Sequence, residues 1–197
     1  GDNNIGNKAT VDLNGHSLTV SRVLESHYGA FNGTANEGYQ RILCSVPSML
    51  IVSGSSPTVY TNAGSIMSGP LTFIKAGSGA FYLGQTNALS GAVIVSNGVL
   101  AVTSTGSLGL NATNVVVAGG TLSLSNSTAL CTAANLTFAA AGTGVIDLPA
   151  AVNVTVSTLW YGDKQKYGGT YGASGSGAQY VDDTRFSGAG KLTVLPG

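Results

Sequence analysis

The sequence predicts an all-β fold, a single-stranded parallel β-helix with about 21–22 residues per coil and capped ends. Three observations predict it. Apolar residues alternate with Ser, Thr or Ala over short runs, no stretch has a helical period, and the same short run recurs at a nearly constant spacing. With 29 Gly among 197 residues and 43% hydrophobic residues, the chain is neither a disordered tail nor a helical protein.

The first expected coil lies near the N-terminus, where apolar residues flank a glycine: Val11, Leu13, Gly15, Leu18 and Val20. The pattern then stops and resumes at Leu50, Val52 and Gly54. We therefore expect four parts: an N-terminal coil or cap (1–23), an irregular insertion (24–46), regular β-helix coils (47–158) and an aromatic, charged C-terminal coil or cap (159–197).

The regular coils each contain an apolar doublet, a glycine corner and a second apolar doublet. The first members of four successive copies are 22, 22 and 21 residues apart. In a β-helix such residues stack into inward columns. We expect one column to contain Leu71, Val93, Val115 and Leu136, and a second to contain Phe81, Leu100, Leu122 and Ile146.

Antiparallel hairpins are the competing interpretation of the same strands. Asn97-Gly98, between Val95 and Leu100, is a strong signal for a two-residue hairpin turn. The constant spacing favours the β-helix, because a meander or sandwich has no reason to keep one period through four units. Local geometry leaves both arrangements open.

Charge is scarce and uneven. The chain has 8 basic and 8 acidic residues, and between Arg41 and Asp147 only Lys75 is charged. We expect the outward face of this region to consist of Ser, Thr, Asn, Ala and Gly. Zero net charge without a basic cluster argues against nucleic-acid binding, and no apolar run is long enough for a membrane-spanning helix.

Three segments carry a resemblance to a known family. The stretch LTFIKAGSGAFYLGQTNALSGAVIVSNGVLAVTSTGSLGLNATNVVVAGGTLSLSNSTAL, residues 71–130, is similar to the autotransporter-associated β-strand repeat of bacterial secreted proteins. VDLNGHSLTV (11–20) resembles the first coil of many right-handed β-helices. YGGTYGASGSGAQYVDDTRFSGAGKLTV (167–194) resembles the terminal coil of long repeat passengers of Verrucomicrobia. The resemblance implies a right-handed β-helix, bacterial export, and an extracellular or cell-surface place; it implies no catalytic residues.

Enzymatic chemistry on a β-helix would need paired carboxylates, or bound calcium with a basic residue, on neighbouring coils. The middle coils have neither. Asp182 and Asp183 are adjacent, so in a strand they would point to opposite faces, and nothing marks Asp12 or Asp147 as acids. We expect a protein that is not an enzyme.

Histidine and cysteine are equally rare. His16 and His27 have no metal-ligand spacing around them, so we expect no metal and no cofactor. Cys44 and Cys131 are 87 residues apart, or four coils, which puts them roughly 19 Å apart along the axis. A disulfide needs Cα atoms within about 7 Å. We expect two free, buried thiols, with an intermolecular bond as the alternative.

Aromatic residues gather near the C-terminus: Trp160, Tyr161, Tyr167, Tyr171, Tyr180 and Phe186. They have two interpretations. The rings could cover the open end of the apolar core as a cap, with nearby charges discouraging further strand pairing. Alternatively, they could form a platform on which an extracellular glycan stacks. We favour the cap.

Two functions remain. The first is a non-catalytic, extracellular structural module, a surface rod or adhesin that can self-assemble into fibres or filaments through copies of itself. Unpaired strand edges at the coil ends and nearly uncharged side walls support it. The alternative is a carbohydrate-binding or carbohydrate-active β-helix, with an extracellular glycan as partner.

Overall fold

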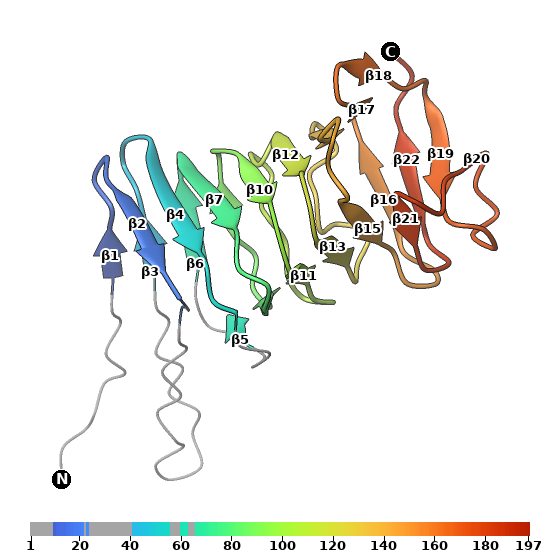
Figure 1. Ribbon diagram of the computed structural model, residues 1–197. Helices are drawn as coiled ribbons and strands as arrows, with labels where there is room; N and C mark the ends of the chain where they lie inside the picture. Colours follow the sequence, from blue (N-terminus) through green and yellow to red (C-terminus); the bar gives the residue numbers. More distant parts are fainter. Residues whose placement is uncertain (1–9, 22, 24–40, 56–59, 63–65) are drawn as a thin grey trace, which may run out of the picture.

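The fold is all-β, and its strands form an elongated row from the N-terminal to the C-terminal end (Figure 1). The computed structural model describes residues 10–21, 23, 41–55, 60–62 and 66–197. No helix occurs among these residues. The described strands pair in parallel except at β17–β18 and β19–β22 near the C-terminus. An all-β, mostly parallel architecture confirms the coarse prediction from the sequence.

The largest sheet has eight strands in the order β18-β17-β14-β12-β10-β7-β4-β2. Seven of them, from β2 to β17, form one continuous parallel series along the row. Their bounds are β2 Ser17–Val20, β4 Ser48–Val52, β7 Leu71–Lys75, β10 Val93–Val95, β12 Asn114–Val117, β14 Asn135–Phe138, β17 Thr158–Tyr161 and β18 Lys164–Gln165.

A second sheet has six strands in the order β21-β15-β13-β11-β8-β5. Its bounds are β5 Tyr60–Asn62, β8 Ala80–Leu83, β11 Val99–Val102, β13 Thr121–Leu124, β15 Val145–Asp147 and β21 Phe186–Ser187. Two four-stranded sheets lie near the ends of the row. One has β1 Thr10–Asp12, β3 Arg41–Leu43, β6 Ile66–Gly69 and β9 Ala88–Leu89; the other has β16 Asn153–Val156, β22 Lys191–Val194, β19 Gly169–Gly172 and β20 Tyr180–Val181.

The strands β10 and β11, on either side of Asn97-Gly98, belong to different sheets, so the hairpin interpretation of this turn is wrong. β10 pairs with β7 and β12, whereas β11 pairs with β8 and β13. Gly98 forms the corner between them with a φ of 67°. A Cβ at Gly98 would lie 2.4 Å from the carbonyl oxygens of Gly77 and Gly79, so the corner requires glycine on both counts.

The second predicted column is confirmed. Phe81, Leu100, Leu122 and Ile146 pair in register and are fully buried, and Phe186 extends the column. The first column is confirmed for Val93, Val115 and Leu136.

At its N-terminal end the first column was predicted wrongly. Val93 lies beside Phe73, and Leu71 lies beside Ser48. Leu71 and Phe73 are both inward residues of β7, so alternation alone could not choose between them. In the following repeat, Gly91 lies against the backbone of Leu71. A Cβ at Gly91 would lie 2.4 Å from the Leu71 carbonyl carbon, so this position takes glycine and not an apolar side chain of the column.

The expected neutral, small-residue exterior is also wrong in part. On the outer face of the eight-stranded sheet, Ile51, Ile74, Ile94 and Val116 lie side by side and are half-buried. Lys75, the isolated charge, points inward with 1% of its surface exposed, between Val52 and Val95. The alternation of inward and outward residues along β7 puts position 75 on the inward face. The sequence analysis singled out this charge without assigning its side chain to a face.

Two predicted boundaries can be placed relative to the strands. Most of the predicted insertion 24–46 lies outside the described residues. Its described part contains β3, which pairs in parallel with β1 and β6. The predicted boundary after residue 158 falls inside β17, which continues the eight-stranded sheet in register with β14.

Candidate functional site

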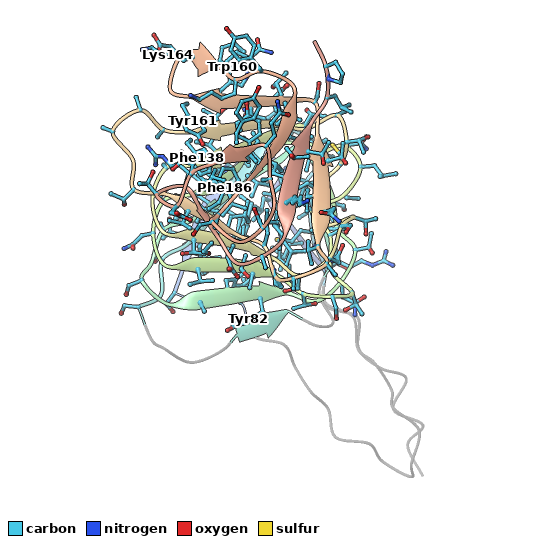
Figure 2. All side chains as sticks on the ribbon, turned by 90° about the vertical axis from the view of Figure 1, so that its right-hand side faces the viewer. Tyr82, Phe138, Trp160, Tyr161, Lys164 and Phe186 are labelled. Atoms are coloured by element: carbon cyan, nitrogen blue, oxygen red, sulfur yellow. The ribbon has the colours of Figure 1, made fainter. Side chains whose placement is uncertain are left out.

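Three aromatic rings contact one another near the C-terminal end of the row of strands. Phe138 of β14 contacts Tyr161 of β17 and Phe186 of β21 edge to face, with ring centroids 5.2 and 5.7 Å apart. Such T-shaped pairs are the geometry that aromatic quadrupoles favour. Figure 2 shows Phe138 and Phe186 within the outline of the sheets, and Tyr161 beside them. The parallel pairing of β14 with β17 accounts for the contact between Phe138 and Tyr161, since the two residues are in register.

Two basic side chains, Arg185 and Lys166, contact the faces of rings in this cluster. The Arg185 guanidinium lies 5.2 Å from the centre of the Phe138 ring, and its Nη1 donates to the carbonyl of Gly142 at 2.7 Å. The Lys166 ammonium lies 4.2 Å from the centre of the Tyr161 ring. These are cation–π contacts at a partly buried site, where they contribute more than at an exposed one.

Tyr161 and Asp182 join the ring cluster to the last turns of the chain. The Tyr161 hydroxyl donates to Asp182 Oδ2 at 2.9 Å. Burial, followed by this hydrogen bond to a carboxylate, raises the pKa of Tyr161 above its ordinary value. Burial also raises the pKa of Asp182, but hydrogen bonds donated by Thr184 and Tyr161 outweigh it, so the Asp182 pKa lies below the usual range.

The remaining aromatic candidates do not form one platform. Tyr171 is buried and stacks on Tyr180 with centroids 4.7 Å apart, and its hydroxyl donates to the Tyr167 carbonyl at 2.8 Å. Burial raises the pKa of Tyr171. The Tyr167 side chain is 82% exposed. Trp160 is half-buried on the outer side of β17, and its Nε1 donates to Thr158 Oγ1 at 3.0 Å (Figure 2).

The carboxylates singled out in the sequence make local hydrogen bonds. Asp147 accepts from Ser123 Oγ at 2.9 Å and from Ser187 Oγ at 2.8 Å, across neighbouring strands. Asp183 accepts from the Ser174 backbone amide at 2.6 Å, so it and Asp182 bind different segments. Asp12 accepts from the Asn14 amide at 2.9 Å. Each of these carboxylates fixes a turn or a strand pair.

The structure confirms that both cysteines are buried and that no disulfide joins them within the chain. Cys44 and Cys131 are free and buried. Burial raises the pKa of the Cys44 thiol. His16 is exposed, and His27 lies outside the described residues. Within the described part of the chain, no three His, Cys, Asp or Glu side chains are placed to hold a metal ion.

A shallow groove that the sequence analysis missed lies at the start of β9. Its residues are hydroxyl, amide or apolar, with no charged group: Thr86, Asn87, Ala88, Ser104, Thr105, Gly106, Ser107, Leu110, Asn111 and Thr128. Leu110 is 86% exposed at its edge. The side chains of Ser104, Ser107 and Asn111 make no hydrogen bond to the described residues. The sequence signal that could have revealed this groove is Leu110, a large apolar residue that lies in a turn and outside the alternating pattern of the strands.

Comparisons with protein families, with curated proteins and with solved structures give no match. Among the described residues, none belongs to a helix capable of crossing a membrane.

Proposed function

We propose that this chain is a right-handed parallel β-helix of the autotransporter-associated type, acting as a non-catalytic structural rod or adhesin-like module outside a bacterial cell. In this proposal it has no cofactor, and its partners are copies of itself. Its aromatic C-terminal segment is a cap that ends the stack.

One observation carries the proposal: strands separated by 20 to 23 residues pair in parallel, in register, from β4 to β17. Each repeat therefore adds one strand to the eight-stranded sheet and one layer to the buried columns. Length in such an architecture grows with repeat number, without a new core for each added unit. That property suits a spacer that carries other parts of a protein away from a surface.

The cap interpretation is supported by the C-terminal ring cluster. Phe138 and Phe186 are nearly inaccessible, and Tyr161 is bonded to Asp182, so these rings are engaged within the chain. β18 lies antiparallel on β17 at the last edge of the eight-stranded sheet. A two-residue strand of Lys164 and Gln165 is short and charged, as is typical of protected edges.

Two measurements test the proposal. Protease treatment of intact cells of the source bacterium, followed by immunodetection, should remove the protein while leaving a cytoplasmic control. The purified chain should release no reducing ends from neutral or acidic polysaccharides. Turnover that is lost in Asp183→Asn would overturn the non-catalytic assignment, and resistance to surface proteolysis until the cells are lysed would overturn the location.

Carbohydrate binding is the second candidate, and the groove beside Leu110 is the observation that favours it. Unbonded hydroxyl and amide groups next to an exposed apolar side chain match a neutral sugar, which has polar edges and an apolar ring face. Affinity electrophoresis in neutral polysaccharides would test this. Retardation lost in Leu110→Ser but kept in the control Val181→Ser would support it, and retardation lost only in Trp160→Ala would move the site to β17.

A further inference from the structure

The corner between β10 and β11 holds an Asn-Gly pair in which the glycine amide faces the asparagine side chain. The Gly98 amide nitrogen donates a hydrogen bond to Asn97 Oδ1, 2.8 Å away. Since a C=O bond is about 1.2 Å long, the same nitrogen lies within about 4 Å of Asn97 Cγ. An asparagine before glycine cyclises most readily, because no Cβ on the glycine hinders the approach of its nitrogen to Cγ. Asn97 is exposed, so water reaches the site.

Cyclisation requires that the Gly98 amide lose its proton. The negative charge left on this nitrogen is shared with the oxygen of the same peptide group, which is the carbonyl oxygen of Asn97. The Lys75 ammonium donates a hydrogen bond to this oxygen at 3.3 Å. A cation in that place stabilises the charge as it develops, and Lys75 is nearly inaccessible to the water that would weaken the interaction. Lys75 therefore makes the Gly98 proton easier to remove.

A second Asn-Gly pair provides an internal comparison. Asn14-Gly15 lies in the turn between β1 and β2, and its glycine amide donates to Ser48 Oγ at 2.9 Å instead of to the asparagine side chain. Among the described residues, no ammonium or guanidinium donates to the Asn14 carbonyl. The third pair, Asn32-Gly33, lies outside the described residues. The arrangement at Asn97 is therefore not a property of the Asn-Gly sequence alone.

We propose that Asn97 is a site of self-modification, at which the Gly98 amide nitrogen attacks Asn97 Cγ with assistance from Lys75. Hydroxide removes the amide proton, a bond forms between the nitrogen and Cγ, and the side-chain amide group takes up a proton and leaves as ammonia. The resulting succinimide adds one water molecule, and breaking either imide C–N bond gives aspartate or isoaspartate. No oxidant or reductant takes part.

Either product places a negative charge in the part of the chain that has the fewest charges. Between Arg41 and Asp147, Lys75 is the one charged residue of the sequence. The reaction would therefore convert a neutral chain into a more acidic form without any enzyme. This inference goes beyond the proposed structural function and does not depend on it.

Peptide mapping by mass spectrometry, during incubation of the purified chain in mildly alkaline buffer, measures the reaction at each Asn-Gly pair. In the folded chain, conversion of the amide to an acid should be about tenfold faster at Asn97 than at Asn14. In denaturant the two rates should agree within about twofold, since the sequence effect of glycine remains and the fold is lost. Isoelectric focusing should show the matching acidic form.

Lys75→Met should slow the reaction at Asn97 about tenfold and leave Asn14 unchanged, because a hydrogen bond from a charged donor is removed. Val95→Ala is the matched control. Val95 lies beside Lys75 in the same inward column, so its truncation loosens the packing there and keeps the cation. It should leave Asn97 at least as reactive as in the unmodified chain. If circular dichroism shows that Lys75→Met is unfolded, Lys75→Gln, with a neutral donor, replaces it.

Three results would overturn the proposal. Equal rates at Asn97 and Asn14 in the folded chain would mean that the corner has no special reactivity. An undiminished rate at Asn97 in the folded Lys75 variant, or an equal slowing by Val95→Ala, would remove the role of the cation. Cleavage of the chain between Asn97 and Gly98 would mean that the asparagine side-chain nitrogen attacks the main chain instead.

Discussion

The ammonium nitrogen of Lys75 donates a hydrogen bond to the backbone carbonyl of Asn97, 3.3 Å away, across the corner between two repeats. The same nitrogen bonds to the carbonyl of Gly77. A single lysine is thereby held inside a column whose neighbouring members are valines. Burial lowers the pKa of Lys75 below its ordinary value.

Replacing Lys75 by Met should change the pH dependence of stability. Since the folded-state pKa lies below that of the unfolded chain, about 10.4, the unfolded state binds more protons between the two values. The stability of the unmodified protein relative to Lys75→Met should therefore rise with pH through that window and be flat below it. Urea unfolding followed by circular dichroism between pH 6 and pH 10.5 measures the difference. A difference that does not vary with pH would mean that the amine is solvated.

Lysine at Val117 should be poorly tolerated. Val117 is fully buried between Val95 and Phe138, and a Cβ placed on Gly144 would lie only 2.6 Å from Val117 Cγ1, so no space remains for a longer side chain. Overpacking together with an unpaired buried charge should lower the free energy of unfolding by about 3 kcal/mol or more. Val116→Lys, on the outer face, is the control and should cost less than about 1 kcal/mol. Similar melting temperatures for the two variants would show that the inward face is wrongly assigned.

Strand alternation made the buried columns predictable, because it shows which residues of a strand face inward. It does not show which inward residue of one strand lies beside which inward residue of the next. Leu71 and Phe73 both satisfy it, and the close approach of Gly91 decides between them. Among the aromatic candidates, the opposite sides of Trp160 and Tyr161 follow from adjacency in β17. The stacking of Tyr171 on Tyr180 does not, because it depends on the parallel pairing of β19 with β20, in which these two residues lie opposite each other.

Asp182 should account for part of the acid sensitivity of the protein. Its folded-state pKa is depressed, so its contribution is present above the unfolded value, about 3.9, and is lost as pH falls through the folded value. Asp182→Asn should lower stability at pH 7 by about 1.5–3 kcal/mol, because charged hydrogen bonds from Tyr161 and Thr184 are removed. Its stability should also vary less with pH between 5 and 2.

Tyr161→Phe serves as the partial variant for this site, since it removes one donor and leaves Asp182 charged. It should show a smaller loss in the same direction, whereas Asp183→Asn, at an exposed carboxylate, should cost less than about 1 kcal/mol. Thermal unfolding across the acid range provides the measurement. If the unmodified chain and the three variants showed the same acid transition, Asp182 would not contribute to the acid sensitivity of the protein.

The two cysteines should be slow to react in the folded protein and fully reactive when it unfolds. Each is 5% exposed, and the Cys44 and Cys131 sulfurs lie 3.7 and 3.6 Å from the carbonyl oxygens of Ser68 and Ala112. Burial raises the pKa of the Cys44 thiol, which lowers the fraction of reactive thiolate at neutral pH. Titration with a chromogenic disulfide should find two thiols for each unreduced chain in denaturant, and a much slower reaction without it. Fewer than two thiols in a monomeric, unreduced chain would require a bridge between residues four repeats apart, and would show that the register of the strands is wrong.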